Sequence, residues 1–246
     1  MTNIGIFGVC GKMGRRIASL AFKDDDVTVV AAVERPDHPL LGKDLGEELG
    51  EETRGVKIVH DVSKIEAKID CMIDFTLPDP TLEHIESCLV KGTPMVIGTT
   101  GFDPAGEEKI YQAAKKIPIV FSPNMSVGVN VLFDIVARAA RTLGGEFSIK
   151  VDETHHVHKK DSPSGTAKMI ARVIKESCEK DVPVEAFREG EVIGNHGIIF
   201  DSKFETMEIR HDAKSRDVFA AGALKAAKFV SGREAALYGM SDVLGL

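Results

Sequence analysis

The chain has 246 residues, which is enough for one large domain or two modest ones, each with its own core. Its net charge of −7 and pI near 5.7 argue against nucleic acid as the main partner, because binding a phosphate backbone needs an extended basic surface. The sequence shows no signal peptide, no apolar run near the ~20 residues that span a bilayer, and no paired spacing among its cysteines. We therefore expect a soluble cytoplasmic protein with free thiols, and no membrane partner.

The N-terminal segment shows the pattern of a strand, a glycine turn, an amphipathic helix and a second strand. Gly8, Gly11 and Gly14 lie where a dinucleotide-binding fold needs a tight turn, close backbone approach to a pyrophosphate, and packing of helix on strand. Glu34 ends the second strand, from which a carboxylate can hydrogen-bond an adenosine ribose, and the adjacent Arg35 can pair with a 2′-phosphate. The segment therefore predicts binding of NAD or NADP.

Short apolar runs alternate with helical patterns up to about residue 125, which indicates a Rossmann-type, doubly wound parallel sheet in an α/β fold. Strands are predicted at 3–7, 27–33, 56–59, 70–73, 94–97 and 118–121, and helices near 12–22, 80–91 and 104–116. Loops of small or polar residues follow the last three strands, namely Asp74-Phe-Thr-Leu-Pro78, Gly98-Thr-Thr-Gly101 and Ser122-Pro-Asn-Met125. Each alone is typical of an ordinary turn. Because ligands bind at the carboxyl edge of such sheets, together they predict a wall of the cofactor site.

The pattern changes after residue 126 to a long helix over about 126–143 and then to strands near 146–153, 192–200 and 203–211. This is typical of a second, mixed α+β domain, whereas the last thirty residues return to helical spacing and are expected to pack on the first domain. We therefore expect a dinucleotide-binding domain formed by residues 1–126 and 217–246, and a substrate-binding and oligomerisation domain formed by residues 127–216. Two chain crossings would then form a hinge that closes on the substrates.

The stretch from Glu153 to Ala167 gathers three histidines, two lysines and a Ser-Gly-Thr turn in an otherwise acidic chain. Its histidines can exchange protons near neutral pH, and Lys159 and Lys160 add fixed positive charge. The segment 163–166 is typical of a helix start, whose free backbone N–H groups bind carboxylates well. These features predict a site for an anionic substrate.

Two other interpretations of this stretch remain open. In a metal site, His156 and His158 would act with Asp161 or Glu153, although two adjacent lysines give such a site no advantage, and we expect no metal. In the other, the stretch is a solvated basic loop. His196 and His211 are expected to be surface residues or satisfied core residues rather than ligands.

Together the motifs resemble the dihydrodipicolinate reductase family, also called 4-hydroxy-tetrahydrodipicolinate reductases. The segments that carry the resemblance occur in that family's order and are Gly8-Val-Cys-Gly-Lys-Met-Gly14, Asp74-Phe-Thr76, Val96-Ile-Gly-Thr-Thr-Gly-Phe102, Asn124-Met-Ser-Val-Gly-Val-Asn130, the stretch 153–167, and Ser215-Arg216. The resemblance implies a cytoplasmic homotetramer that reduces the small cyclic dicarboxylate 4-hydroxy-tetrahydrodipicolinate with NADH or NADPH, in the diaminopimelate route of lysine biosynthesis.

The resemblance also implies roles for individual residues. His155 would be the proton donor and acceptor, Lys159 the second proton donor, and His156, Gly165 and Thr166 would bind a substrate carboxylate. Contacts to the cofactor would come from Gly8, Val9, Cys10, Gly11, Lys12, Met13, Glu34, Arg35, Gly98, Thr99, Thr100, Ser122, Pro123, Asn124 and Met125. Leu77 stands where members of the family carry an arginine near the cofactor, so we expect NADH to be used at least as well as NADPH.

Two functions of other kinds stay open. Another nicotinamide-dependent dehydrogenase of a small carboxylated substrate would share the glycine turn, but it has no reason to carry the histidine-lysine stretch. A non-catalytic dinucleotide sensor would use that stretch for a partner protein, and turnover of NADH with substrate separates it from the two enzymes.

Overall fold

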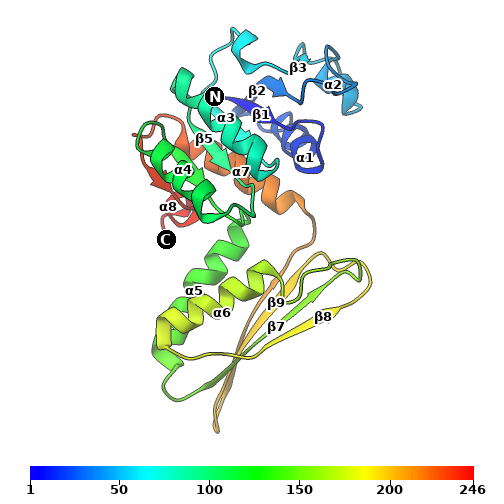
Figure 1. Cartoon of the computed structure of the whole chain (residues 1–246). Coiled ribbons are helices and arrows are strands. Elements are labelled where there is room, and N and C mark those ends of the chain that lie inside the picture. The colour runs from blue at the N-terminus through cyan, green and yellow to red at the C-terminus, as the bar shows by residue number, and fades with distance from the viewer. The chain divides into compact units, whose positions relative to one another are not determined.

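The computed structural model describes all 246 residues, and the chain divides into two compact units (Figure 1). Unit 1 comprises residues 1–125 and 219–245, and unit 2 comprises residues 126–218 together with Leu246. None of the helices combines the length and the apolar character that a membrane span requires.

Unit 1 is built on a seven-stranded sheet in the order β11-β6-β5-β4-β1-β2-β3, in which every pair of neighbouring strands is parallel. The strands are β1 (Thr2–Phe7), β2 (Val27–Val33), β3 (Ile58–Val59), β4 (Cys71–Asp74), β5 (Met95–Ile97), β6 (Ile119–Phe121) and β11 (Leu237–Tyr238). The helices are α1 (Lys12–Ala21), α2 (Leu45–Glu48), the 3₁₀ helix η1 (Val62–Lys64), α3 (Pro78–Lys91), α4 (Pro104–Ala114), most of α7 (Asp217–Val230), and α8 (Met240–Leu244). The first six strands have the Rossmann order, which confirms the predicted doubly wound parallel sheet.

The strands of unit 1 are apolar runs because helices cover both faces of the sheet, and β4 is buried along its whole length. One hydrophobic cluster packs α1, α7 and α8 against one face, and a second packs α3 and α4 against the other. The C-terminal helices thus share a core with β1, and Ala223 and Val230 are completely buried beside Ile4. The strand order reverses beside β1, so the carboxyl ends of β1, β2 and β4 form one crevice.

Unit 2 is built on a four-stranded mixed sheet in the order β10-β9-β7-β8. Its strands are β7 (Ser148–His155), β8 (Val184–Arg188), β9 (Asn195–Asp201) and β10 (Thr206–Asp212), and its helices are α5 (Val127–Leu143) and α6 (Gly165–Cys178). Alternate residues of β7 are buried, and Ile149 and Val151 share a core with Val136 of α5 and Ile170 of α6. The two helices therefore cover one face of this sheet (Figure 1).

The structure contains helices and strands that were not predicted, and some predicted strands are shorter in it. Strand β2 has the predicted bounds, but β8, the two-residue β11 and the four-residue α2 were not predicted, because such short segments carry too little periodicity. The strand predicted from residue 203 begins at Thr206, since the Ser202 N–H donates to the carbonyl of Glu205 across a turn, at 3.0 Å.

Candidate active site

The glycine turn after β1 forms a backbone cradle that side chains would fill. Gly8 has a φ of +63°, and a Cβ atom there would lie 2.6 Å from Cγ2 of Thr76. A Cβ atom at Gly14 would lie 2.3 Å from the carbonyl oxygen of Gly8, so α1 approaches β1 this closely only with glycine. Helix α1 has no capping side chain and no acidic residue in its first turn. Its free N–H groups and the open turn fit the pyrophosphate of a dinucleotide.

Glu34, which follows β2, holds the glycine turn through a hydrogen bond to its backbone. Its carboxylate accepts hydrogen bonds from the N–H of Cys10 at 3.0 Å and from the N–H of Arg35 at 3.1 Å. Burial and the neighbouring charge of Glu34 raise the pKa of the Cys10 thiol to about 11, so the thiol stays protonated at neutral pH. The guanidinium of Arg35 is largely exposed and pairs with Asp37 at 3.5 Å.

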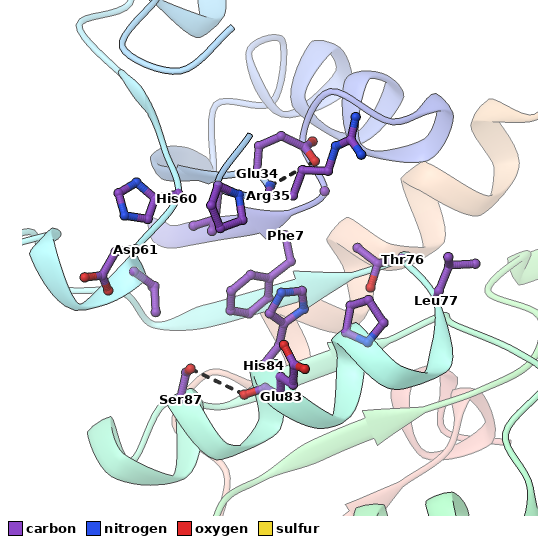
Figure 2. Close-up of a pocket in the computed structure, with 15 residues that line it drawn as sticks. Phe7, Glu34, Arg35, His60, Asp61, Thr76, Leu77, Glu83, His84 and Ser87 are labelled. Atoms are coloured by element: carbon purple, nitrogen blue, oxygen red, sulfur yellow. Dashed lines mark hydrogen bonds between the residues drawn. The ribbon is translucent and has the colours of Figure 1, made fainter. Parts of the chain in front are cut away.

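A pocket of about 500 Å³ lies at this edge of the sheet (Figure 2). Its lining includes Gly8, Glu34 and Arg35, three of the residues predicted to bind cofactor, together with the exposed Leu77. The other lining residues are Phe7, Val33, Pro36, His60, Asp61, Val62, Thr76, Pro80, Glu83, His84 and Ser87. The volume is within the range of small-molecule sites.

The two remaining predicted cofactor loops follow β5 and β6 and do not line this pocket. Gly98 packs so tightly that a Cβ atom there would lie 2.3 Å from the ring of Phe75. The Thr99 hydroxyl hydrogen-bonds Thr81 at 2.9 Å, and the Ser122 hydroxyl donates to the carbonyl of Asn124 at 2.9 Å. A hydrogen bond to α3 thus holds the loop after β5, and a hydrogen bond within the loop holds the one after β6.

In unit 2, the carboxylate of Glu153 is the centre of the polar site. Glu153 and His155 lie two residues apart on the same face of β7, and their side chains hydrogen-bond through Nδ1 of His155. The completely buried carboxylate also accepts from the Ser164 N–H and from Nη1 of Arg188, each at 3.1 Å. Burial raises the pKa of Glu153, but the Ser164 N–H, His155 and Arg188 outweigh it and lower the pKa overall. Glu153 is therefore a carboxylate at neutral pH.

His155 is held as a neutral imidazole with a defined tautomer. Burial, with the charges of Lys159 and Arg188, lowers its pKa against the opposing effect of Glu153. Because the Glu153 carboxylate can only accept, the Nδ1 of His155 carries the proton. Its Nε2 is then free to exchange a proton with a ligand.

The next β-strands contribute two residues that sequence analysis missed. Strand register places Arg188 of β8 beside His155, and His196 of β9 opposite Glu153. The Nε2 of His196 lies 3.4 Å from the Ser164 hydroxyl, and burial lowers the pKa of His196 to about 4. The expectation that His196 and His211 are surface or satisfied residues is wrong, because each has a buried Nδ1 without a hydrogen-bond partner. No local pattern in the sequence marks the ion pair of Arg188 with Glu153 or the pairing of His196 with Glu153 across the strands.

The basic loop after β7 brings the other predicted substrate residues near this centre. Lys159 forms an ion pair with Asp161 at 2.9 Å, and Arg188 binds the backbone carbonyl of Asp161 at 2.6 Å. His156 has a buried Nδ1 without a protein partner, which suits a ligand contact. Gly165 and Thr166 open α6 after Ser164, whose hydroxyl accepts the N–H of Ala167 at 3.1 Å.

The metal-site interpretation of this stretch does not fit the positions of His156 and His158. The His158 side chain is 75% exposed and lies 3.6 Å from Glu191. Possible ligand atoms do approach one another in two other groups, Cys10 with Glu34 and His38, and Glu153 with His155 and His196. Since the Glu153 oxygens already bind three donors, we assign no metal there.

A Rossmann-type dinucleotide-binding unit and a second unit with a buried histidine–carboxylate pair beside a basic loop define a nicotinamide-dependent oxidoreductase. Two family models match, "Dihydrodipicolinate reductase, N-terminus" over residues 2–125 and "Dihydrodipicolinate reductase, C-terminus" over residues 128–244. The chain belongs to the dihydrodipicolinate reductase family.

Individual relatives agree with this assignment. The chain is 39% identical to a 4-hydroxy-tetrahydrodipicolinate reductase of Anaeromyxobacter dehalogenans, with 100% of this chain and 98% of the relative covered. It is 42% identical to the protein of the same name from Dechloromonas aromatica, with the same coverage. Among solved structures, dipicolinate-bound dihydrodipicolinate reductase from Paenisporosarcina sp. TG-14 has the same fold, with a TM-score of 0.81, 24% identity and 97% of each chain covered.

Proposed function

We propose that the protein reduces 4-hydroxy-tetrahydrodipicolinate to tetrahydrodipicolinate with NADH or NADPH, in the diaminopimelate pathway of lysine biosynthesis. The observation that carries the proposal is the neutral His155, fixed by buried Glu153 beside Lys159, in a chain whose two halves both match the reductase family. A sensor protein has no need of such a proton-exchanging group.

Unit 1 would hold the cofactor, which supplies a hydride to the substrate when bound. The turn from Gly8 to Met13 would bind the pyrophosphate, and Glu34 and Arg35 the adenosine ribose. The loops 98–100 and 122–125 would line the remainder of the dinucleotide. The exposed Arg35 attracts a 2′-phosphate, but the Glu34 carboxylate repels one and Leu77 brings no positive charge to the pocket. We therefore expect NADH to serve at least as well as NADPH.

Unit 2 would bind and protonate the substrate. His156 and the Gly165-Thr166 helix start would hold a carboxylate through N–H donors, beside the positive charge of Lys159. Reduction of an unsaturated nitrogen ring leaves electron density that must be protonated, and Nε2 of His155 can deliver that proton once the ring has taken up a second proton as imidazolium. The lowered pKa of His155 makes its imidazolium form a stronger acid, with Lys159 as second donor.

We also propose a cytoplasmic homotetramer, assembled through unit 2. The four cysteines are free, which suits a reducing compartment. The side of the sheet away from α5 and α6 is uncovered, and near it Phe187 is 51% and Phe204 88% exposed. Such exposed aromatic side chains are typical of subunit contacts. Light scattering during gel filtration should give a mass of about four times the 26.6 kDa of the chain.

The decisive assay follows NADH oxidation by near-ultraviolet absorbance while the preceding synthase makes the substrate from pyruvate and aspartate semialdehyde. We expect oxidation that depends on every component, loss of turnover in His155→Ala with NADH binding retained, and loss of both rate and substrate affinity in Lys159→Ala. NADH binding without oxidation would favour another dehydrogenase or a sensor, and full activity of His155→Ala would refute its role.

A further inference from the structure

The pocket of unit 1 contains an imidazole ring that is fixed on two sides and partly exposed to the pocket. His84 lies on α3, and its ring stacks on that of Phe7, with centroids 3.9 Å apart and planes at 3° (Figure 2). Its Nδ1 lies 2.7 Å from a carboxylate oxygen of Asp74. The side chain is 23% exposed, Nε2 has no hydrogen-bond partner, and the ring lines the pocket. One ring face and one ring nitrogen are thus available to a ligand.

The hydrogen bonds of Asp74 determine which nitrogen is available. Asp74 is completely buried and accepts from the Thr76 N–H at 2.9 Å, the Thr76 hydroxyl at 2.6 Å and the Thr99 hydroxyl at 3.4 Å. The Asp74 carboxylate accepts all of these hydrogen bonds, and it accepts one from His84 as well. The Nδ1 of His84 must therefore carry a proton. The network fixes both the orientation and the tautomer of the ring.

The surroundings of the ring indicate what binds there. The same pocket contains Gly8 and Glu34, to which the proposed function assigns the pyrophosphate and the ribose. A base attached to that ribose must lie within reach of the pocket walls. Val33, Leu77 and Pro80 give those walls an apolar surface. A flat ring, already stacked from behind, is a surface on which a purine can stack, and an imidazole nitrogen can hydrogen-bond the purine edge.

We propose that His84, backed by Phe7 and oriented by Asp74, is the platform for the adenine base of the dinucleotide. This inference rests on the proposed function and goes beyond it by naming the base contact. Because the platform touches the base and not the ribose phosphate, it serves NADH and NADPH alike. Discrimination between NADPH and NADH, which differ in the 2′-phosphate, would then depend on the exposed Arg35.

Isothermal titration calorimetry with AMP, 2′,5′-ADP, NADH and NADPH tests this assignment. We expect His84→Ala to raise the dissociation constants of all four ligands about tenfold, since stacking of a base on an aromatic side chain contributes of this order. His84→Phe keeps the stacking surface and should recover part of the affinity. Arg35→Ala should weaken only the two ligands that carry a 2′-phosphate.

Ser87→Ala is the matched control, because Ser87 lies one turn along α3, lines the same pocket and bonds only the carbonyl of Glu83. Melting temperatures establish that each variant is folded. Dissociation constants within twofold of the wild type in folded His84→Ala would overturn the platform, and so would a loss confined to 2′,5′-ADP and NADPH. Wild-type protein that binds neither NADH nor AMP would instead overturn the proposed function, and this inference with it.

Discussion

At the scale of single residues, the Glu153 carboxylate sets the state of His155. Glu153 bonds Nδ1 of His155 and raises its pKa, while burial and two nearby cations lower it. The three donors around Glu153 come from β7, β8 and the start of α6, so the pair is held from several elements at once. This arrangement is that of a base oriented by a buried carboxylate.

The substitution Glu153→Gln tests this positioning role. Losing the negative charge removes the effect that raises the pKa of His155, so the pKa falls further and less imidazolium is available to donate. We expect kcat to fall about a hundredfold, the typical size of an acid–base contribution. The alkaline limb of the pH profile should move to lower pH, while the dissociation constant of NADH stays unchanged.

Glu191→Gln is a suitable control, because it makes the same chemical change at an exposed residue whose partner is His158. Circular dichroism must show folded Glu153→Gln protein, since the change also leaves the partly buried Arg188 without its carboxylate. An unchanged pH profile with reduced kcat would indicate a structural role alone.

At the scale of elements, Gly222 lets α7 approach the loop that follows β6. A Cβ atom at Gly222 would lie 1.7 Å from the carbonyl oxygen of Met125, although α7 has helical backbone there. Alanine normally favours a helix over glycine by about 1 kcal/mol. Here we expect Gly222→Ala to lower the free energy of unfolding by about 1 to 3 kcal/mol, because α7 or the loop must move.

Urea denaturation measures this change, and Gly145→Ala is the control, since a Cβ atom there meets nothing within 4 Å. The displaced loop includes residues 122–125, which were predicted to contact the cofactor, so Gly222→Ala should also weaken NADH binding. A variant as stable as the wild type would show that the helix has room to shift.

How much of the site was predictable depends on how far its residues lie apart along the chain. The glycine turn and the stretch 153–167 are local patterns, and they predicted the β1-turn-α1 unit and the position of His155. Arg188 and His196 meet Glu153 only through the register of β7 with β8 and β9, which no local pattern encodes. His84 likewise reaches Phe7 through the packing of α3 on the sheet. The sequence therefore marked His155 as a candidate proton donor, but not the side chains that orient it.

At the scale of the whole molecule, the buried histidines make stability depend on pH. His196 is 4% exposed, and burial lowers its pKa to about 4 from an ordinary 6.5, with help from the charges of His155, His211 and Lys159 and against that of Glu153. Burial lowers the pKa values of His155 and His211 in the same direction. Three histidines of unit 2 therefore resist protonation in the folded state.

The sign of the effect follows from proton binding. Between pH 6.5 and about 4 the unfolded chain binds a proton at residue 196 that the folded chain does not, so the free energy of unfolding falls as the pH falls. The depressed pKa of Glu153 adds a further loss at lower pH, below its ordinary 4.5. For His196 alone, the loss from about pH 7 to about pH 5 is on the order of 2 kcal/mol.

Urea denaturation across this pH range, on wild type and His196→Gln, measures the loss. Glutamine keeps a polar group near the Ser164 hydroxyl but cannot be protonated, so the variant should lose less stability between about pH 7 and about pH 5 by on the order of 2 kcal/mol. The stability of His196→Gln at neutral pH will itself differ from that of the wild type. The quantity to compare is therefore the change in the free energy of unfolding with pH in each protein. Equal slopes in the two proteins would mean that His196 is protonated in the folded state, contrary to its burial among His155, His211 and Lys159.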